Sequence, residues 1–300
     1  MLKILSVICF IVCVSCNKGD VASKCSTIPN GPAHGWEYLY DSAYSYFTDI
    51  NPANGTEILF VKRPFNNGLC RLYIYDAVTR KSREIFQGRI IFSPRWGTNG
   101  WILLNLSDAN IWKIKDNGDS LIQLTFTGNL YTPSWNYTHD KFIADRADNV
   151  RALYDETGGF ITVLNGLYQY GTNIYFFNDS LFAYTADREL GIYNIKTLQK
   201  EVLARLEGDN FFRNPIVRQE TVLCYANQGL YSVNMQTRQL VHLTSSCNAK
   251  VYGYLSYSKH LDKLFVTQTT SSVMNAQSLF QKSSILMVNP DGSNEVNISQ

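Results

Sequence analysis

The chain has 300 residues, of which 45% are hydrophobic and 17% are charged. This composition is too apolar for a disordered chain and supplies enough side chains for a large buried core. The net charge of +2, from 27 basic and 25 acidic residues, argues against a nucleic-acid-binding surface.

The N-terminus has the features of an export signal. Lys3 precedes an 11-residue apolar run, Ile4 to Val14, which is too short for a membrane helix of about 20 residues. The run ends at Ser15-Cys16 and resembles a bacterial lipoprotein signal, in which the cysteine thiol takes a diacylglyceryl group. This resemblance implies a signal peptide over residues 1–15, lipidation of Cys16, a tether over residues 16–32 and a lipid-anchored protein of the bacterial cell envelope. An ordinary cleaved secretory signal and an uncleaved anchor are the alternatives.

Four cysteines remain for the exported body, and they are Cys25, Cys70, Cys224 and Cys247. Exported proteins can form disulfides, and sequence proximity favours the pairs Cys25–Cys70 and Cys224–Cys247. Because Cys70 and Cys224 lie in apolar runs, the alternative is that both are small buried residues.

The body of the chain repeats six times with a period of about 40 residues. An apolar residue closes each unit, and successive copies are 39, 40, 39, 40 and 55 residues apart: Ile85, Leu124, Leu164, Leu203, Leu243 and Ile298. About nine residues upstream, an alternating apolar strand ends at a residue that keeps the same spacings: Asp76, Lys115, Asp155, Asn194, Asn234 and Asn289.

Each unit has the pattern of short β-strands. The apolar residues alternate with period two, and dipeptides such as Asn54-Gly55 and Asn99-Gly100 favour hairpins. A unit of about 40 residues with four strands is a propeller blade, so we predict an all-β, six-bladed β-propeller over residues 33–300. The longer sixth unit places its extra residues near 268–282. Residues 36–50 are expected to zip the first and last blades together, or to form an ordered extension across one face.

Several motifs within the units resemble the PD40 repeats of TolB-like propellers. The motifs are Pro133-Ser134-Trp135, Ser93-Pro94-Arg95-Trp96, Asp145-Arg146, Asp187-Arg188, Leu124-Thr125 and Leu243-Thr244. The resemblance runs from about Ile50 to the C-terminus. It implies the same six-bladed fold and a protein partner in the cell envelope, although such folds host many functions.

The sequence contains no nucleophile, phosphate-binding or metalloprotease motif. Its four histidines, His34, His139, His242 and His260, fall in different units and share no ligand spacing. The Asp145-Arg146 and Asp187-Arg188 pairs recur by unit, which favours a structural role. We therefore expect no catalytic residue, no metal and no cofactor.

Most aromatic residues occupy repeat positions, where they are expected to pack between blades. Aromatic residues outside the repeat positions are the candidates for a binding surface: Tyr44, Tyr46, Tyr168, Tyr170, Phe211 and Phe212.

The prediction for function is a non-enzymatic, lipid-anchored scaffold that binds an envelope protein and no nucleic acid. The first alternative is a carbohydrate- or peptide-binding lipoprotein, the second is a metal-dependent polysaccharide lyase or a hydrolase, and the third is a degenerate propeller kept only for its structure.

Overall fold

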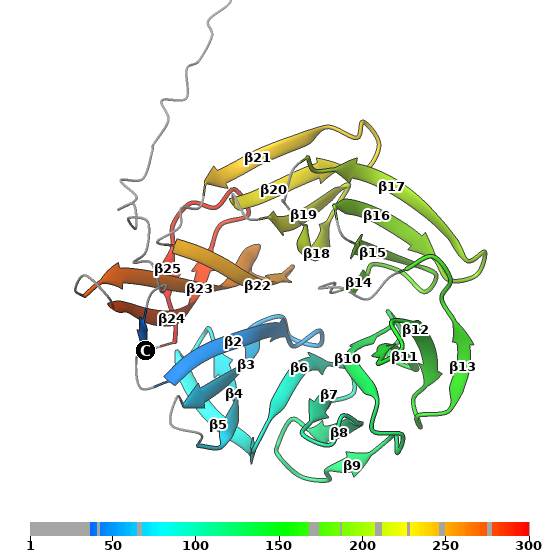
Figure 1. Cartoon of the computed structure of the whole chain (residues 1–300), viewed down its shortest axis with the longest axis horizontal. Helices are drawn as coiled ribbons and strands as arrows, with labels where there is room; N and C mark the ends of the chain where they lie inside the picture. Colours follow the sequence, from blue (N-terminus) through cyan, green and yellow to red (C-terminus); the bar gives the residue numbers. More distant parts are fainter. Residues whose placement is uncertain are drawn as a thin grey trace, which may run out of the picture.

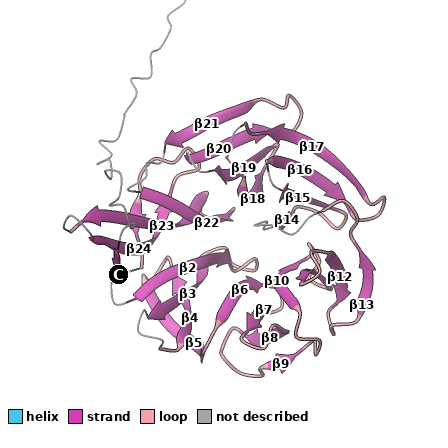
Figure 2. Cartoon of the chain, viewed as in Figure 1, coloured by secondary structure: helices cyan, strands magenta, loops and turns pink. Residues whose placement is uncertain are grey.

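The computed structural model of the chain describes residues 37–40, 43–64, 68–167, 174–186, 188–207, 212–226, 229–245, 250–274 and 278–299. The expected signal peptide, Cys16 and the tether lie outside these residues. The described segments contain strands and turns but no helix, as Figure 2 shows. Accordingly, none of them is a helix of the length and apolarity that crossing a membrane requires.

The strands form six sheets arranged as blades around one axis (Figure 1). From the inner to the outer strand, blades 1 to 3 consist of β2 (Ala43–Ile50), β3 (Glu57–Pro64), β4 (Cys70–Asp76) and β5 (Lys81–Gly88); β6 (Ile91–Trp96), β7 (Trp101–Leu106), β8 (Ile111–Lys115) and β9 (Ile122–Gln123); and β10 (Leu130–Trp135), β11 (Lys141–Arg146), β12 (Arg151–Asp155) and β13 (Phe160–Val163). Blades 4 and 5 consist of β14 (Ile174–Phe176), β15 (Leu181–Ala186), β16 (Glu189–Asn194) and β17 (Gln199–Arg205); and β18 (Arg213–Arg218), β19 (Thr221–Ala226), β20 (Gly229–Asn234) and β21 (Leu240–Ser245). The predicted six-bladed propeller is confirmed.

Both ends of the described chain complete blade 6. Its core is β22 (Lys250–Ser258), β23 (Lys263–Val273) and β24 (Ser278–Val288). The short β25 (Val296–Asn297) pairs antiparallel with one half of β24, and β1 (Glu37–Tyr40) pairs parallel with the other half. The segment 36–50, which was expected to join the first and last blades, therefore forms two strands. β1 pairs with the last blade, and β2 is the inner strand of the first blade.

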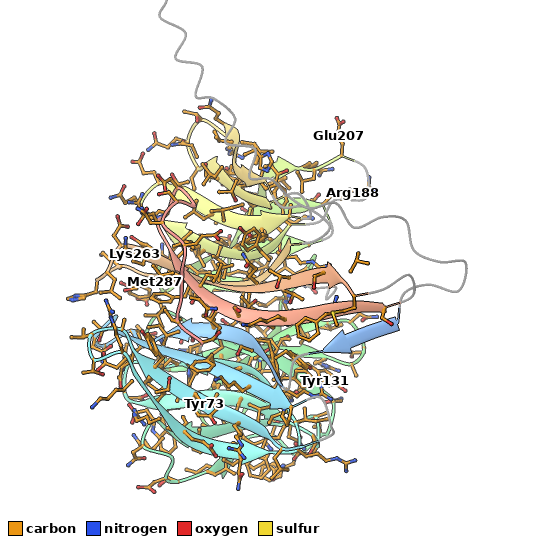
Figure 3. All side chains as sticks on the ribbon, turned by 90° about the vertical axis from the view of Figure 1, so that its left-hand side faces the viewer. Tyr73, Tyr131, Arg188, Glu207, Lys263 and Met287 are labelled. Atoms are coloured by element: carbon orange, nitrogen blue, oxygen red, sulfur yellow. The ribbon has the colours of Figure 1, made fainter. Side chains whose placement is uncertain are left out.

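The extra residues of the sixth unit lengthen one hairpin, as the sequence predicted. Both β23 and β24 are 11 residues long, and they pair from Leu264↔Val288 to Val273↔Leu279. Seen from the edge of the ring, this hairpin and β1 extend beyond the ends of the neighbouring strands (Figure 3).

Six apolar clusters lie between neighbouring blades, one for each interface of the closed ring. The apolar residue that closes each sequence unit packs in one of these clusters. Ile85, for example, joins the cluster between blades 1 and 2, and Ile298 joins the cluster between blades 6 and 1. The 40-residue period is thus the period of blade-to-blade burial, which is the main stabilising contribution in this fold.

A β-bulge interrupts the inner strand of five blades, all except blade 4 in its described part. In four of them a residue other than glycine adopts a positive φ of 44° to 52°: Phe47, Ser93, Thr132 and Asn214. A bulge inserts one residue and bends the strand. The residue two positions after each of these four lines the centre of the ring: Asp49, Arg95, Ser134 and Ile216.

Candidate functional site

An axial funnel of about 740 Å³ lies at the centre of the ring. Every inner strand contributes to its wall, through Asp49, Arg95, Ser134, Tyr175, Ile216 and Ser256 among others. The turns after several inner strands line its mouth, including Lys259 and His260 after β22. Lys263, just beyond that turn, marks the funnel face in the edge-on view of Figure 3, while Arg188 and Glu207 lie towards the opposite face.

Asp49 links two blades within the funnel wall. Its Oδ2 accepts a hydrogen bond from the backbone N–H of Trp96 at 2.6 Å. Burial raises the pKa of the Asp49 carboxyl, while the charge of Arg95 and the N–H groups of Trp96 and Ile50 act in the opposite direction. One carboxylate oxygen of Asp49 is therefore already used in a hydrogen bond between blade 1 and blade 2.

Arg95 is the charged group set into the same wall. Its side chain is half-buried and makes no hydrogen bond or ion pair with any described residue. Its charge acts on Asp49 and on the phenol of Tyr254. A guanidinium carries five N–H donors in a planar fork, so Arg95 can present several donors to a ligand.

Four further polar atoms in the funnel wall have no hydrogen-bond partner among the described residues. They are Trp96 Nε1, Trp135 Nε1, Ser256 Oγ and His139 Nδ1, and the first three residues are only 3%, 6% and 5% exposed. An indole N–H can only donate, and a buried group without a partner costs about 1–3 kcal/mol. An acceptor on a bound ligand would recover part of that cost.

Burial also shifts the pKa values of His139 and Tyr175 in the funnel. Burial lowers the pKa of His139 to about 4, although the neighbouring Asp140 opposes this effect. Burial also raises the pKa of Tyr175 to about 12, with smaller contributions from Asp49 and from two other phenols. At neutral pH both side chains are therefore uncharged, and they contribute polar rings to the funnel lining.

None of the three aromatic candidates that the structure describes lines the funnel. Tyr46 is buried, and its hydroxyl donates to the backbone oxygen of Ile91 at 3.0 Å. Phe212 is also buried and meets Tyr231 edge-on. These two side chains are core residues and correct the expectation that they present a surface. Tyr44 is half-buried and accepts a hydrogen bond from Arg63 at 3.2 Å. The other three candidates, Tyr168, Tyr170 and Phe211, lie outside the described residues.

Cys70 and Cys224 are buried free thiols in the structure. Cys70 packs between blades 1 and 2, and Cys224 packs between blades 4 and 5. Burial raises the pKa of the Cys224 thiol. These positions match the alternative that both are small buried residues; their expected partners, Cys25 and Cys247, lie outside the described residues.

The adjacent residues Asp145 and Arg146 do not pair with each other, although they are neighbours in the sequence motif. Asp145 pairs across the β11–β12 hairpin with Arg151, whose Nε lies 2.7 Å from Asp145 Oδ1. Arg146 instead pairs with Asp148 on the surface. The structural role is confirmed for Asp145, whereas Asp187 lies outside the described residues.

The three histidines that the structure describes lie in separate blades, and the described residues contain no group of three or more metal-binding side chains. His139 and His260 line the funnel, while His242 stacks on Tyr231 with a centroid distance of 4.5 Å.

Asp49 and Arg95 were not among the site residues predicted from the sequence. Trp96 and Trp135 belong to the repeat motifs, and their spacing of 39 residues places both at the same position in adjacent blades. A recurring Trp followed by a polar turn was the available signal for the funnel wall.

No family model and no curated protein matches the sequence. Solved structures do match the fold. TolB from Acinetobacter baumannii matches with a TM-score of 0.65 and 16% identity over 83% of this chain and 64% of that one. A putative TolB from Agrobacterium tumefaciens matches with a TM-score of 0.62 and 15% identity over 76% and 87%. An oligogalacturonate lyase in complex with manganese matches with a TM-score of 0.55 and 13% identity over 86% and 77%. At these identities the likeness shows a TolB-like propeller fold, which binding proteins and enzymes share.

Proposed function

We propose that this protein is a cell-envelope lipoprotein whose propeller binds a segment of a partner protein in the axial funnel. The observation that carries the proposal is the funnel itself, because its wall holds a guanidinium and four buried polar atoms that have no hydrogen-bond partner among the described residues. A concave site that combines apolar walls with a few convergent polar groups is typical of ligand binding. The expected lipid on Cys16 would hold this site at a membrane surface.

The experiment is crosslinked affinity capture from native envelopes, quantified by mass spectrometry. Lipid attachment is followed in parallel with a fatty-acid label. The anchor variant is Cys16→Ala, and Cys13→Ala serves as its control because Cys13 lies within the expected signal peptide. We expect the label on the wild type and on Cys13→Ala but not on Cys16→Ala.

The same capture locates the binding face. Tyr137 is 56% exposed at the funnel mouth, so Tyr137→Ala changes the funnel with little effect on folding. Tyr131, 37% exposed at the other end of β10, supplies the control Tyr131→Ala. A stoichiometric partner that is reduced by Tyr137→Ala and kept by Tyr131→Ala supports the proposal. Capture of nothing above background, or equal loss in both variants, contradicts it.

A glycan is the second candidate ligand, favoured by the aromatic lining of the funnel. Trp96, Trp135, Tyr137 and Tyr175 all contribute to this lining, and sugar rings stack on such side chains. Titration with envelope glycans, followed by tryptophan fluorescence, separates this candidate from the protein partner.

A further inference from the structure

We infer that the funnel contains a carboxylate-binding subsite centred on Arg95, which takes an acidic side chain or the C-terminal carboxylate of the inserted protein segment. This inference rests on the proposed function, since it names the chemistry that the partner brings into the funnel. The N–H groups of Trp96 and Trp135 are the additional donors of the subsite.

The charge balance of the funnel favours an anion. Asp49 is the one acidic residue among the lining residues that the structure describes, and its Oδ2 is already bonded to the backbone of Trp96. Arg95 and the exposed Lys259 are both cationic, and neither makes a hydrogen bond or ion pair with a described residue. An incoming carboxylate therefore meets two cations and one partly engaged carboxyl group.

The hydrogen-bonding balance points to the same ligand. Arg95 and the two indole N–H groups can only donate, Ser256 can donate through its hydroxyl, and His139 Nδ1 donates in the tautomer that carries its proton there. A carboxylate only accepts, through two oxygens that match the spacing of the guanidinium fork. A cationic or donor-rich segment would leave these buried groups unpaired.

The fold fixes the backbone position of Arg95. It follows the bulge at Ser93, where φ is 44°, and precedes Trp96, whose backbone is bonded to blade 1 and whose side chain is buried between blades. These contacts fix the backbone from which Arg95 extends, while its long side chain stays free to orient its guanidinium towards a ligand.

Direct binding tests the subsite with the full-length protein in detergent. The probes are three peptides: tetraglutamate amide, tetraglutamine with a free C-terminus, and tetraglutamine amide. They carry side-chain carboxylates, one terminal carboxylate, and none. Tryptophan fluorescence reports binding, because Trp96 and Trp135 lie in the funnel wall.

We expect one or both carboxylate-bearing peptides to bind and the amide without carboxylates not to bind. Arg95→Gln should weaken binding about 10- to 100-fold, the range for a hydrogen bond to a charged group. Arg95→Lys should lie between Arg95→Gln and the wild type because it keeps the charge but loses the fork. Arg71→Gln, at an exposed arginine paired with Glu84 outside the funnel, should have no effect.

Equal binding of all three peptides, or unchanged binding to folded Arg95→Gln, would overturn the subsite. If Arg95→Gln fails to fold, Arg95→Lys and the three-peptide comparison still decide. Binding of tetragalacturonate together with no binding of either carboxylate peptide would also overturn it, in favour of an acidic sugar. If the amount of captured partner is the same with Arg95→Gln as with the wild type, the subsite is refuted and the proposed function stands. If no partner is captured at all, the proposed function is refuted, and the peptide result still decides the subsite.

Discussion

The buried ion pair of blade 3 offers a sharp test of the structure. Arg151 is 1% exposed and Asp145 is 4% exposed, and Arg151 Nε lies 2.7 Å from Asp145 Oδ1. Thr132, at the bulge of the inner strand, donates its hydroxyl to the other carboxylate oxygen. Replacing Arg151 with Met therefore leaves a buried carboxylate without its cation, and removal of one member of such a pair costs about 3–5 kcal/mol.

The same blade supplies a matched control. Arg146 and Asp148 are also 2.7 Å apart, but their side chains are 33% and 50% exposed. An exposed pair contributes at most about 1 kcal/mol, so Arg146→Met should be nearly neutral. The double replacement Asp145→Leu with Arg151→Met should recover most of the loss, because it removes both buried charges.

Guanidinium unfolding and calorimetry measure these differences. At about 2–4 °C per kcal/mol for a domain of this size, Arg151→Met should lower Tm by roughly 6–20 °C. Equal losses for Arg151→Met and Arg146→Met would refute the reasoning, since burial would then make no difference to the value of the pair. A double variant less stable than either single variant at positions 145 and 151 would refute it as well.

Three further outcomes are expected. Ile285→Ala, in the cluster that closes the ring between blades 6 and 1, should cost about 2–5 kcal/mol in denaturant unfolding, and an unchanged midpoint would contradict closure by burial. Because burial lowers the pKa of His139 to about 4, the folded state binds fewer protons than the unfolded state below pH 6.5. The free energy of unfolding should therefore fall as the pH drops from about 6.5 towards 4, and it should fall less steeply in His139→Asn. NMR titration of His139 checks this, and a pKa near 6.5 would contradict it. Cys70 and Cys224 should resist alkylation in the native protein and react after unfolding, as peptide mapping by mass spectrometry will show; rapid labelling of the native protein would mean that these blade interfaces open.

Much of the fold could be predicted from the sequence because each blade must bury the same positions. In or directly after the outer strand of every blade, an apolar residue packs towards the neighbouring blade, so Ile85, Leu124 and their equivalents recur at fixed spacing. The longer sixth unit also follows from spacing alone. Local patterns suffice here because neighbouring blades are neighbours in the sequence.

The funnel could not be predicted in this way, since its wall joins residues from six separate units. The bulges add a second difficulty: one inserted residue reverses which side chains face each side of a strand. Alternation in the first inner strand therefore did not distinguish the buried Tyr46 from Asp49, which lines the funnel. The sequence by itself determined the period, the strands and the number of blades. Only the tertiary structure decided which polar groups meet at the axis, because ring closure and backbone bulges place them there.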